Sequence, residues 1–257
     1  MELYIFDRTF EGLLTAVFEF YDRKAKNVKL MSKDTYQPGL LDDEVTFIIS
    51  DREKAARVWK GLQKKLSNNW QNTFFKAFLS ENELVLNDLF EFSRYVFDNP
   101  RGVENDFGNK YVLEISQTAK KVNRENHRMK AFIRFQKTAD GIYYAAVEPD
   151  FNVLPLIVSF FKNRYADQKW VIYDIKRKYG LFYDLYKVEE ISYEFALNVN
   201  ALRLPVEAMD AKEELSSLLW KDYFDSTNIT ERKNMKLHIQ HVPKRYWKYL
   251  NEKKGKN

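Results

Sequence analysis

The tripeptide Glu148-Pro149-Asp150 places two carboxylates close together where a predicted strand leads into a predicted helix. Groups at such strand ends often project into sites, and two carboxylates can act as acid and base or hold a divalent cation. A structural interpretation competes, in which Asp150 caps the helix and Glu148 pairs with Arg134 across a hairpin. Because caps and cross-strand pairs are common, we favour it. The catalytic residues stay unassigned, with Glu148, Asp150 and His127 as candidates.

A second stretch with chemical potential is HIQHVPKRYWKYLNE, residues 238–252, where basic and aromatic side chains are interleaved. If PKRYWKYL is a helix, two lysines four residues apart share one side and the tyrosines lie on another. We expect the tyrosine side to dock into the domain and the basic side to face a polyanion, with Arg245 on a phosphate. Trp247 could either dock into the domain or stack on a base. The side chains concerned are Lys244, Arg245, Tyr246, Trp247, Lys248 and Tyr249.

Charge is distributed unevenly along the chain, although its formal net value is only +5. Residues 231–257 hold nine Lys/Arg and two Asp/Glu, and residues 120–137 hold seven and one. These two basic segments carry net charges of +7 and +6, so the remainder carries −8. Two positive segments on an acidic body indicate a surface for a polyanion more than a generally adhesive protein, and two solvated faces are the alternative.

The central basic segment predicts a helix from about Lys110 to about Asn126 and then a strand. On that strand Lys130, Phe132 and Arg134 would share one face. Two cations around a ring suit phosphate contact combined with base stacking. The alternative is that Phe132 is buried at the sheet edge under the methylene stems of the two cations.

The remaining pattern predicts an α+β fold. MKAFIRFQK and IYYAAVEP alternate around the turn TADG, and WVIYDIKRKYGLFYDL predicts a second hairpin. Helices capped by Thr9 and Asp51 belong to an N-terminal β-α-β-α unit ending near Leu66, and two further helices break near Ser80. We expect one domain, subdivided as 1–100 and 101–257. The antiparallel sheet of four to five strands comprises 129–137, 142–148, 169–176 and 180–194, with helices packed on it, and the C-terminal third is helical at 211–226, 230–241 and PKRYWKYL.

Several classes of protein are disfavoured by what the sequence lacks. There is no cysteine, so disulfides and thiolate chemistry are ruled out, as expected of a cytoplasmic protein. No secretory leader, apolar membrane span or glycine-rich phosphate loop is visible, so we expect no membrane and no nucleotide cofactor. His238 and His241 could share a metal ion, but no third ligand lies nearby, so we predict no metal site.

Several stretches occur in an order found in one protein family. They are HRMKAFIRF (127–135), VEPD (147–150), FFKNRYADQKW (160–170), LWKDYFDS (219–226) and NMKLHIQHVPKRYW (234–247). On these residues the chain resembles the domain-of-unknown-function 4130 family, bacterial proteins assigned to DNA metabolism or repair. The resemblance covers essentially the whole chain, including TFEGLLTAVFEFY near its start, and is strongest from about residue 120 to 250.

The resemblance implies that DNA is the partner. Similar proteins are associated with a radical-SAM DNA-repair protein, and a similar domain occurs fused to a uracil-DNA glycosylase-like domain. We expect a DNA-binding accessory protein; the alternative is a glycosylase- or nuclease-like enzyme using Glu148 or Asp150. Phe151-Asn152 stands where the family pattern has a histidine pair, so histidine chemistry is not expected there. The expected nucleic-acid-binding residues are Arg124, His127, Arg128, Lys130, Phe132, Arg134, Arg164, Lys236, Lys244, Arg245, Tyr246 and Trp247.

Overall fold

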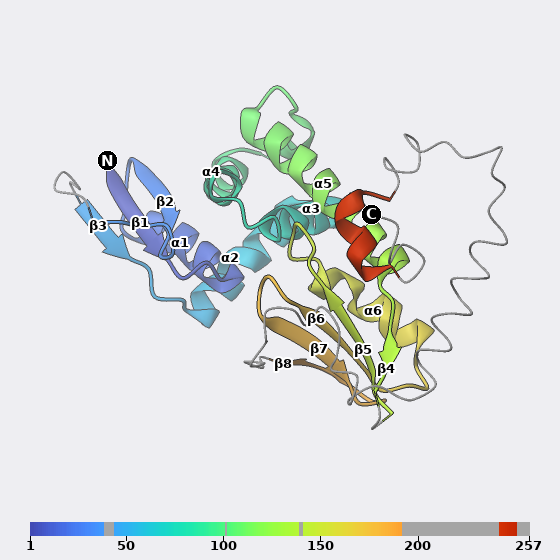
Figure 1. The fold of residues 1–257 in the computed structure, drawn as a ribbon. Coiled ribbons are helices and arrows are strands. Elements are labelled where there is room, and N and C mark those ends of the chain that lie inside the picture. The colour runs from blue at the N-terminus through green and yellow to red at the C-terminus, as the bar shows by residue number, and fades with distance from the viewer. Residues whose placement is uncertain (39–43, 101, 139–140, 192–241, 251–257) are drawn as a thin grey trace. The chain divides into compact units, whose positions relative to one another are not determined.

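The structure is a computed structural model that describes residues 1–38, 44–100, 102–138, 141–191 and 242–250. The chain forms two compact units, Met1–Asn123 and Arg124–Asn257. Each unit combines helices with a sheet of its own, as Figure 1 shows, and this confirms the α+β class. None of the helices in the described ranges is long and apolar enough to cross a membrane.

The first unit is built on three parallel strands in the order β2-β1-β3. They are β1 (Glu2–Phe6), β2 (Val28–Ser32) and β3 (Glu44–Phe47). The predicted β-α-β-α unit did not include β2. Its sequence, VKLMS, is short and lies between charged residues that are typical of a loop. The two predicted caps are confirmed: Thr9 accepts a hydrogen bond from the N–H of Gly12, and Asp51 accepts from Glu53 and Lys54.

Helices supply the rest of the first unit. They are α1 (Phe10–Asp22), α2 (Arg52–Lys65), α3 (Asn68–Phe78) and α4 (Glu83–Asp98), followed by the 3-10 turn η1 (Val103–Asn105). The gap between α3 and α4 confirms the predicted break near Ser80. Tyr4, Phe74 and Phe90 are fully buried in the core between helices and sheet. Helix α5 (Lys110–Phe132) then carries the chain into the second unit.

The second unit holds a five-stranded sheet in the order β4-β5-β6-β7-β8. The strands are β4 (Gln136–Lys137), β5 (Tyr143–Val147), β6 (Trp170–Asp174), β7 (Tyr179–Tyr183) and β8 (Val188–Ile191). The predicted hairpin of β6 and β7 is confirmed. The prediction of a purely antiparallel sheet was wrong, because β5 and β6 run parallel. Helix α6 (Leu154–Arg164) connects these two strands and returns the chain across the sheet between them.

The predicted strand 129–137 was also wrong over most of its length. Helix α5 continues to Phe132, and only Gln136 and Lys137 pair with β5. The buried residues Val122, Met129 and Ile133 recur at helical spacing, so the helix buries an apolar stripe that a strand would split between two faces. Lys130 and Phe132 therefore lie on a helix, and the three-residue strand face with Arg134 does not exist.

An aromatic cluster holds α6 against the sheet. Trp170 is fully buried, with its ring centroid 6.3 Å from that of Phe161 on α6 and 5.4 Å from that of Tyr183 on β7. Beyond this core, Lys244–Tyr249 form the short 3-10 helix η4, which matches the expected helical character of PKRYWKYL. The expected helices 211–226 and 230–241 lie outside the described residues.

Candidate functional site

Glu125 on α5 is the centre of the candidate site. Its side chain is only 1% exposed, and it accepts hydrogen bonds from three directions. The hydroxyl of Tyr246 donates to Oε1, the backbone N–H of Asp150 donates to Oε1 over 3.0 Å, and Nη2 of Arg245 donates to Oε2 over 3.2 Å. A buried carboxylate that is this well satisfied ties together α5, the Glu-Pro-Asp segment and η4.

Tyr246 anchors η4 to α5. Its side chain is buried, and its ring centroid lies 5.5 Å from that of Phe132. Burial and the hydrogen bond to Glu125 both raise the pKa of the Tyr246 phenol, so it remains a neutral donor at physiological pH. Leu250 is buried as well, which confirms that one side of this segment docks into the domain. A buried Tyr246 contributes to docking and not to base stacking.

The backbone of the Glu-Pro-Asp segment is held by Arg177. Its Nη1 donates to the carbonyl of Pro149 over 3.1 Å, and its Nη2 donates to that of Asp150 over 3.2 Å. The guanidinium also pairs with Asp174 at the end of β6, at 2.8 Å. Asp174 is fully buried, and its burial raises the pKa of its carboxyl group, while Arg177 opposes that shift.

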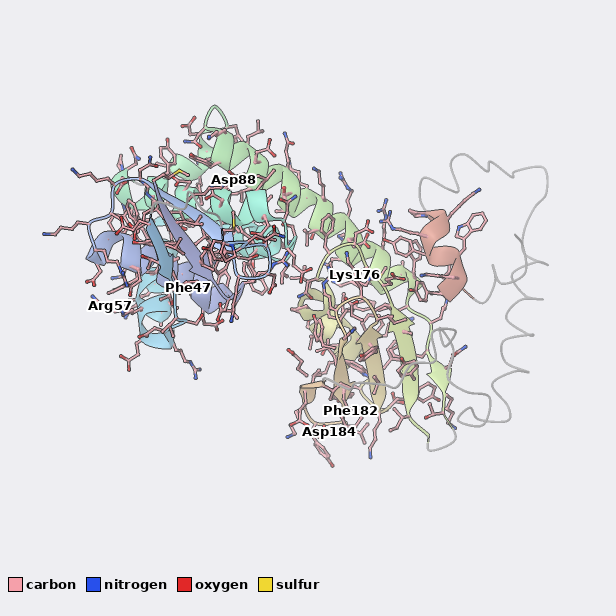
Figure 2. All side chains as sticks on the ribbon, turned by 60° about the vertical axis from the view of Figure 1, so that its left-hand side comes forward. Phe47, Arg57, Asp88, Lys176, Phe182 and Asp184 are labelled. Carbon is pink, nitrogen blue, oxygen red and sulfur yellow. The ribbon has the colours of Figure 1, made fainter. Side chains whose placement is uncertain are left out.

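Glu148 faces η4. Its Oε2 accepts hydrogen bonds from Nζ of Lys248 and, over 3.0 Å, from the hydroxyl of Tyr249. The hydrogen bond from Lys248 is the main cause that lowers the pKa of Glu148, and Lys176 in the turn after β6 (labelled in Figure 2) adds to it. The expected partner Arg134 instead donates to the carbonyls of Ala131 and Ile133, so the predicted cross-strand pair was wrong.

Asp150 does not cap α6, which was the structural role predicted for it. The N-cap of that helix is Val153, with no side-chain hydrogen bond, because three residues separate Asp150 from the first helical turn. Oδ2 of Asp150 lies 2.6 Å from Nη2 of Arg245 instead. Arg245 is thereby shared between Asp150 and the buried Glu125.

The chemistry open to these carboxylates follows from their partners. Glu148 has a lowered pKa and is ionised at neutral pH, so it can accept a proton or a cation but is a poor general acid. Among the described residues, no group of three or more His, Cys, Asp and Glu is arranged to hold a metal ion. His238 and His241 lie outside the described residues.

The expected nucleic-acid contacts occupy different surroundings. Arg124 and His127 are exposed on α5, Arg164 is exposed at the end of α6, and Lys244 is exposed on η4. Three others contact neighbouring groups of the protein. Nη1 of Arg128 lies 3.6 Å from Oε2 of Glu125, and Nζ of Lys130 lies 5.5 Å from the ring centroid of Phe160. Nε1 of Trp247 donates a hydrogen bond to the carbonyl of Val242 over 3.0 Å. Lys236 lies outside the described residues.

The contacts of Glu125 bring the described parts of both basic segments together within the second unit. Arg124, His127 and Arg128 lie on the same helix as Glu125, while Lys244 and Arg245 adjoin its partner Tyr246. Basic side chains of the two segments thus adjoin one buried hydrogen-bond network. We call this set, Arg124, His127, Arg128, Lys244 and Arg245, the basic rim.

Sequence reasoning missed three residues of the site: Glu125, Asp174 and Arg177. Glu125 was counted only as the single acidic residue of a basic segment. An isolated acid among seven basic residues is a usable signal, since it is well placed to organise them. Asp174 offered a weaker signal, a carboxylate ending the apolar strand WVIYD.

Comparison with protein families relates the chain to a known one. The family model described as domain of unknown function (DUF4130) matches residues 81–252, which is more than half of the chain. The match contains the Glu-Pro-Asp segment, Glu125, Arg177 and η4. No curated protein matches the chain.

Proposed function

The chain belongs to the DUF4130 family, and we propose that it is a DNA-binding protein of DNA metabolism or repair. The observation that carries the proposal is the docking of η4 on α5 through Tyr246 and Glu125. This contact unites cations from two segments that are far apart in the sequence. Basic side chains that two separate segments contribute to one unit are typical of a protein that binds a phosphate backbone.

The ion pairs of the site show which cations are paired within the protein and which are available to bind phosphate. Arg245 and Lys248 pair with Asp150 and Glu148, so part of their charge is used inside the protein. Arg124 and Lys244 have no carboxylate partner within 4.0 Å among the described residues, and both are exposed. We assign these two residues to phosphate contact. Arg245 is positioned by its carboxylate partners, and Trp247, which is half-buried beside Lys244, supplies a ring for a base.

Binding of labelled DNA to a charge-reversed variant tests this assignment. Arg124→Glu combined with Lys244→Glu should weaken binding about equally on every sequence, because phosphate contacts carry no base information. The matched control reverses Lys60 and Lys64, two exposed lysines on α2, and should leave the affinity nearly unchanged. Equal losses in both variants would indicate a nonspecific effect of net charge and would contradict the assignment.

The finer proposal is an accessory role for a radical-SAM DNA-repair protein. It rests on the sequence resemblance described above. Purification of the tagged chain from its native cells, with and without nuclease treatment, tests it. A radical-SAM protein should co-purify in both samples if the contact is direct. Its loss after nuclease treatment would leave DNA as the only link between the two proteins.

The alternative proposal is a DNA-processing enzyme of the glycosylase or nuclease type. The observation that favours it is the ionised carboxylate of Glu148, whose side chain is 41% exposed. That carboxylate could activate a water molecule or take part in holding a divalent cation. Turnover of damaged DNA by the wild type with added magnesium, lost in a folded Glu148→Gln variant, would establish the enzyme. DNA retention without turnover would favour the binding protein.

A further inference from the structure

The two edge strands of the parallel sheet in the first unit differ in whether their outward backbone groups are hydrogen-bonded. On the β2 edge, Asn87 of α4 accepts the N–H of Leu30 over 3.0 Å, and Glu83 accepts the N–H of Ser32 over 3.2 Å. Side chains of a neighbouring helix thus satisfy backbone groups that would otherwise point outward. Capping of this kind prevents a sheet edge from pairing with another chain.

Among the described residues of the first unit, no side chain caps the backbone of the β3 edge in this way. Ile48 donates its N–H inward to the carbonyl of Ile5 at 2.7 Å, so the residues on either side of it direct their backbone groups outward. These outward residues are Val45, Phe47 and Ile49. The structure gives their backbone N–H groups no partner within residues 1–38, 44–100 and 102–123. Unpaired strand edges are templates for a further strand.

Two apolar side chains along this edge are also exposed, although the ring of Phe47 contacts that of Tyr36 with the centroids 6.1 Å apart. Phe47 is 60% exposed and Ile49 is 86% exposed, and Figure 2 shows Phe47 on the sheet of the first unit. From Val45 to Ile49 the chain contains no charge, proline or glycine, the residues with which proteins usually blunt an edge. Parallel sheets normally have both faces covered, so exposed apolar side chains on one of them are unusual. The combination of open backbone and exposed apolar side chains indicates an interface.

We propose that a second copy of this chain pairs with β3, antiparallel about a two-fold axis, to form a homodimer. We choose a second copy as the partner because the strand is complementary to itself. The register that places Phe47 opposite Phe47 of the other copy also places Val45 opposite Ile49, so every outward residue meets an apolar residue. Any other in-phase register leaves at least one of the three opposite a residue outside this stretch. An isologous contact of this kind closes after two subunits.

Disulfide trapping gives the sharpest test, because the wild-type chain has no cysteine. In a hydrogen-bonded antiparallel pair the facing Cα atoms are about 5.5 Å apart, a separation that a disulfide spans. Phe47→Cys should therefore form a covalent dimer readily under mild oxidation. Leu84→Cys, at a position that is 77% exposed on α4, is the matched control and should remain monomeric. Equal cross-linking of both variants would overturn the proposal.

Sedimentation of the full chain provides the second readout. The wild type should be in a concentration-dependent equilibrium between monomer and dimer, and Phe47→Lys should shift the dissociation constant upward at least tenfold. Leu84→Lys should sediment like the wild type, and circular dichroism should show that both variants are folded. A wild type that is monomeric at every concentration would overturn the proposal. So would capture of an unrelated extended peptide by β3 in preference to a second copy.

Discussion

The hydroxyl of Tyr246 donates a hydrogen bond to the buried carboxylate of Glu125, 121 residues earlier in the chain. This contact fixes the position of η4 and with it the basic rim. Tyr246→Phe removes the donor while keeping the ring, and it should lower the free energy of unfolding by about 2 kcal/mol, as expected for a hydrogen bond to a charged group. Urea unfolding measures the change.

The matched control is Tyr186→Phe, because Tyr186 is 83% exposed and lies in the same unit. Substitution of an exposed side chain away from buried networks should change stability by no more than about 0.5 kcal/mol. Similar losses in the two variants would show that the Tyr246 hydroxyl contributes nothing specific.

Arg177 and Asp174 form the second support of the site. Arg177→Met would leave Asp174 buried without its partner and should destabilise the protein by about 3–5 kcal/mol. Adding Asp174→Asn removes the uncompensated charge and should restore part of the loss. Thermal or urea unfolding of the two single variants and the double variant measures this coupling. Additive losses would mean that the pair is not energetically linked.

The ion pair of Glu148 and Lys248 predicts a pH dependence. A lowered pKa means that folding favours the carboxylate, so the stabilisation is present above the ordinary pKa of a glutamate and is lost as the pH falls through the lowered value. Wild type should therefore be more stable than Glu148→Gln at neutral pH, with the difference vanishing in acid. Lys248→Met should show the same trend. A difference between wild type and Glu148→Gln that does not change with pH would contradict this role.

Local signals in the sequence predicted local structure well. Thr9 and Asp51 cap helices as expected, since an N-cap is decided by a side chain and backbone groups two or three residues away. The break near Ser80 and the hairpin of β6 and β7 were predictable for the same reason. The strand expected at 129–137 failed because AFIRF alternates over a few residues only, and the longer helical repeat through Met129 and Ile133 prevailed.

The partners within the site could not be predicted. Glu148 lies 100 residues from Lys248, and nothing local distinguishes that lysine from Arg134 as its partner. Tertiary packing makes the choice, because η4 is placed beside the Glu-Pro-Asp segment by the burial of Tyr246. The crossover through α6 likewise makes β5 and β6 parallel, although the local sequence of each strand predicts a hairpin.

The slope of the logarithm of DNA affinity against the logarithm of salt concentration tests the central claim most directly. For about five neutralised phosphates on duplex DNA, the wild type should give a slope of roughly −4 to −5. The combined Arg124→Glu and Lys244→Glu variant should bind more weakly and with a shallower slope. A salt-independent affinity, or no binding at low salt to either single- or double-stranded DNA, would contradict the claim that the basic rim binds DNA.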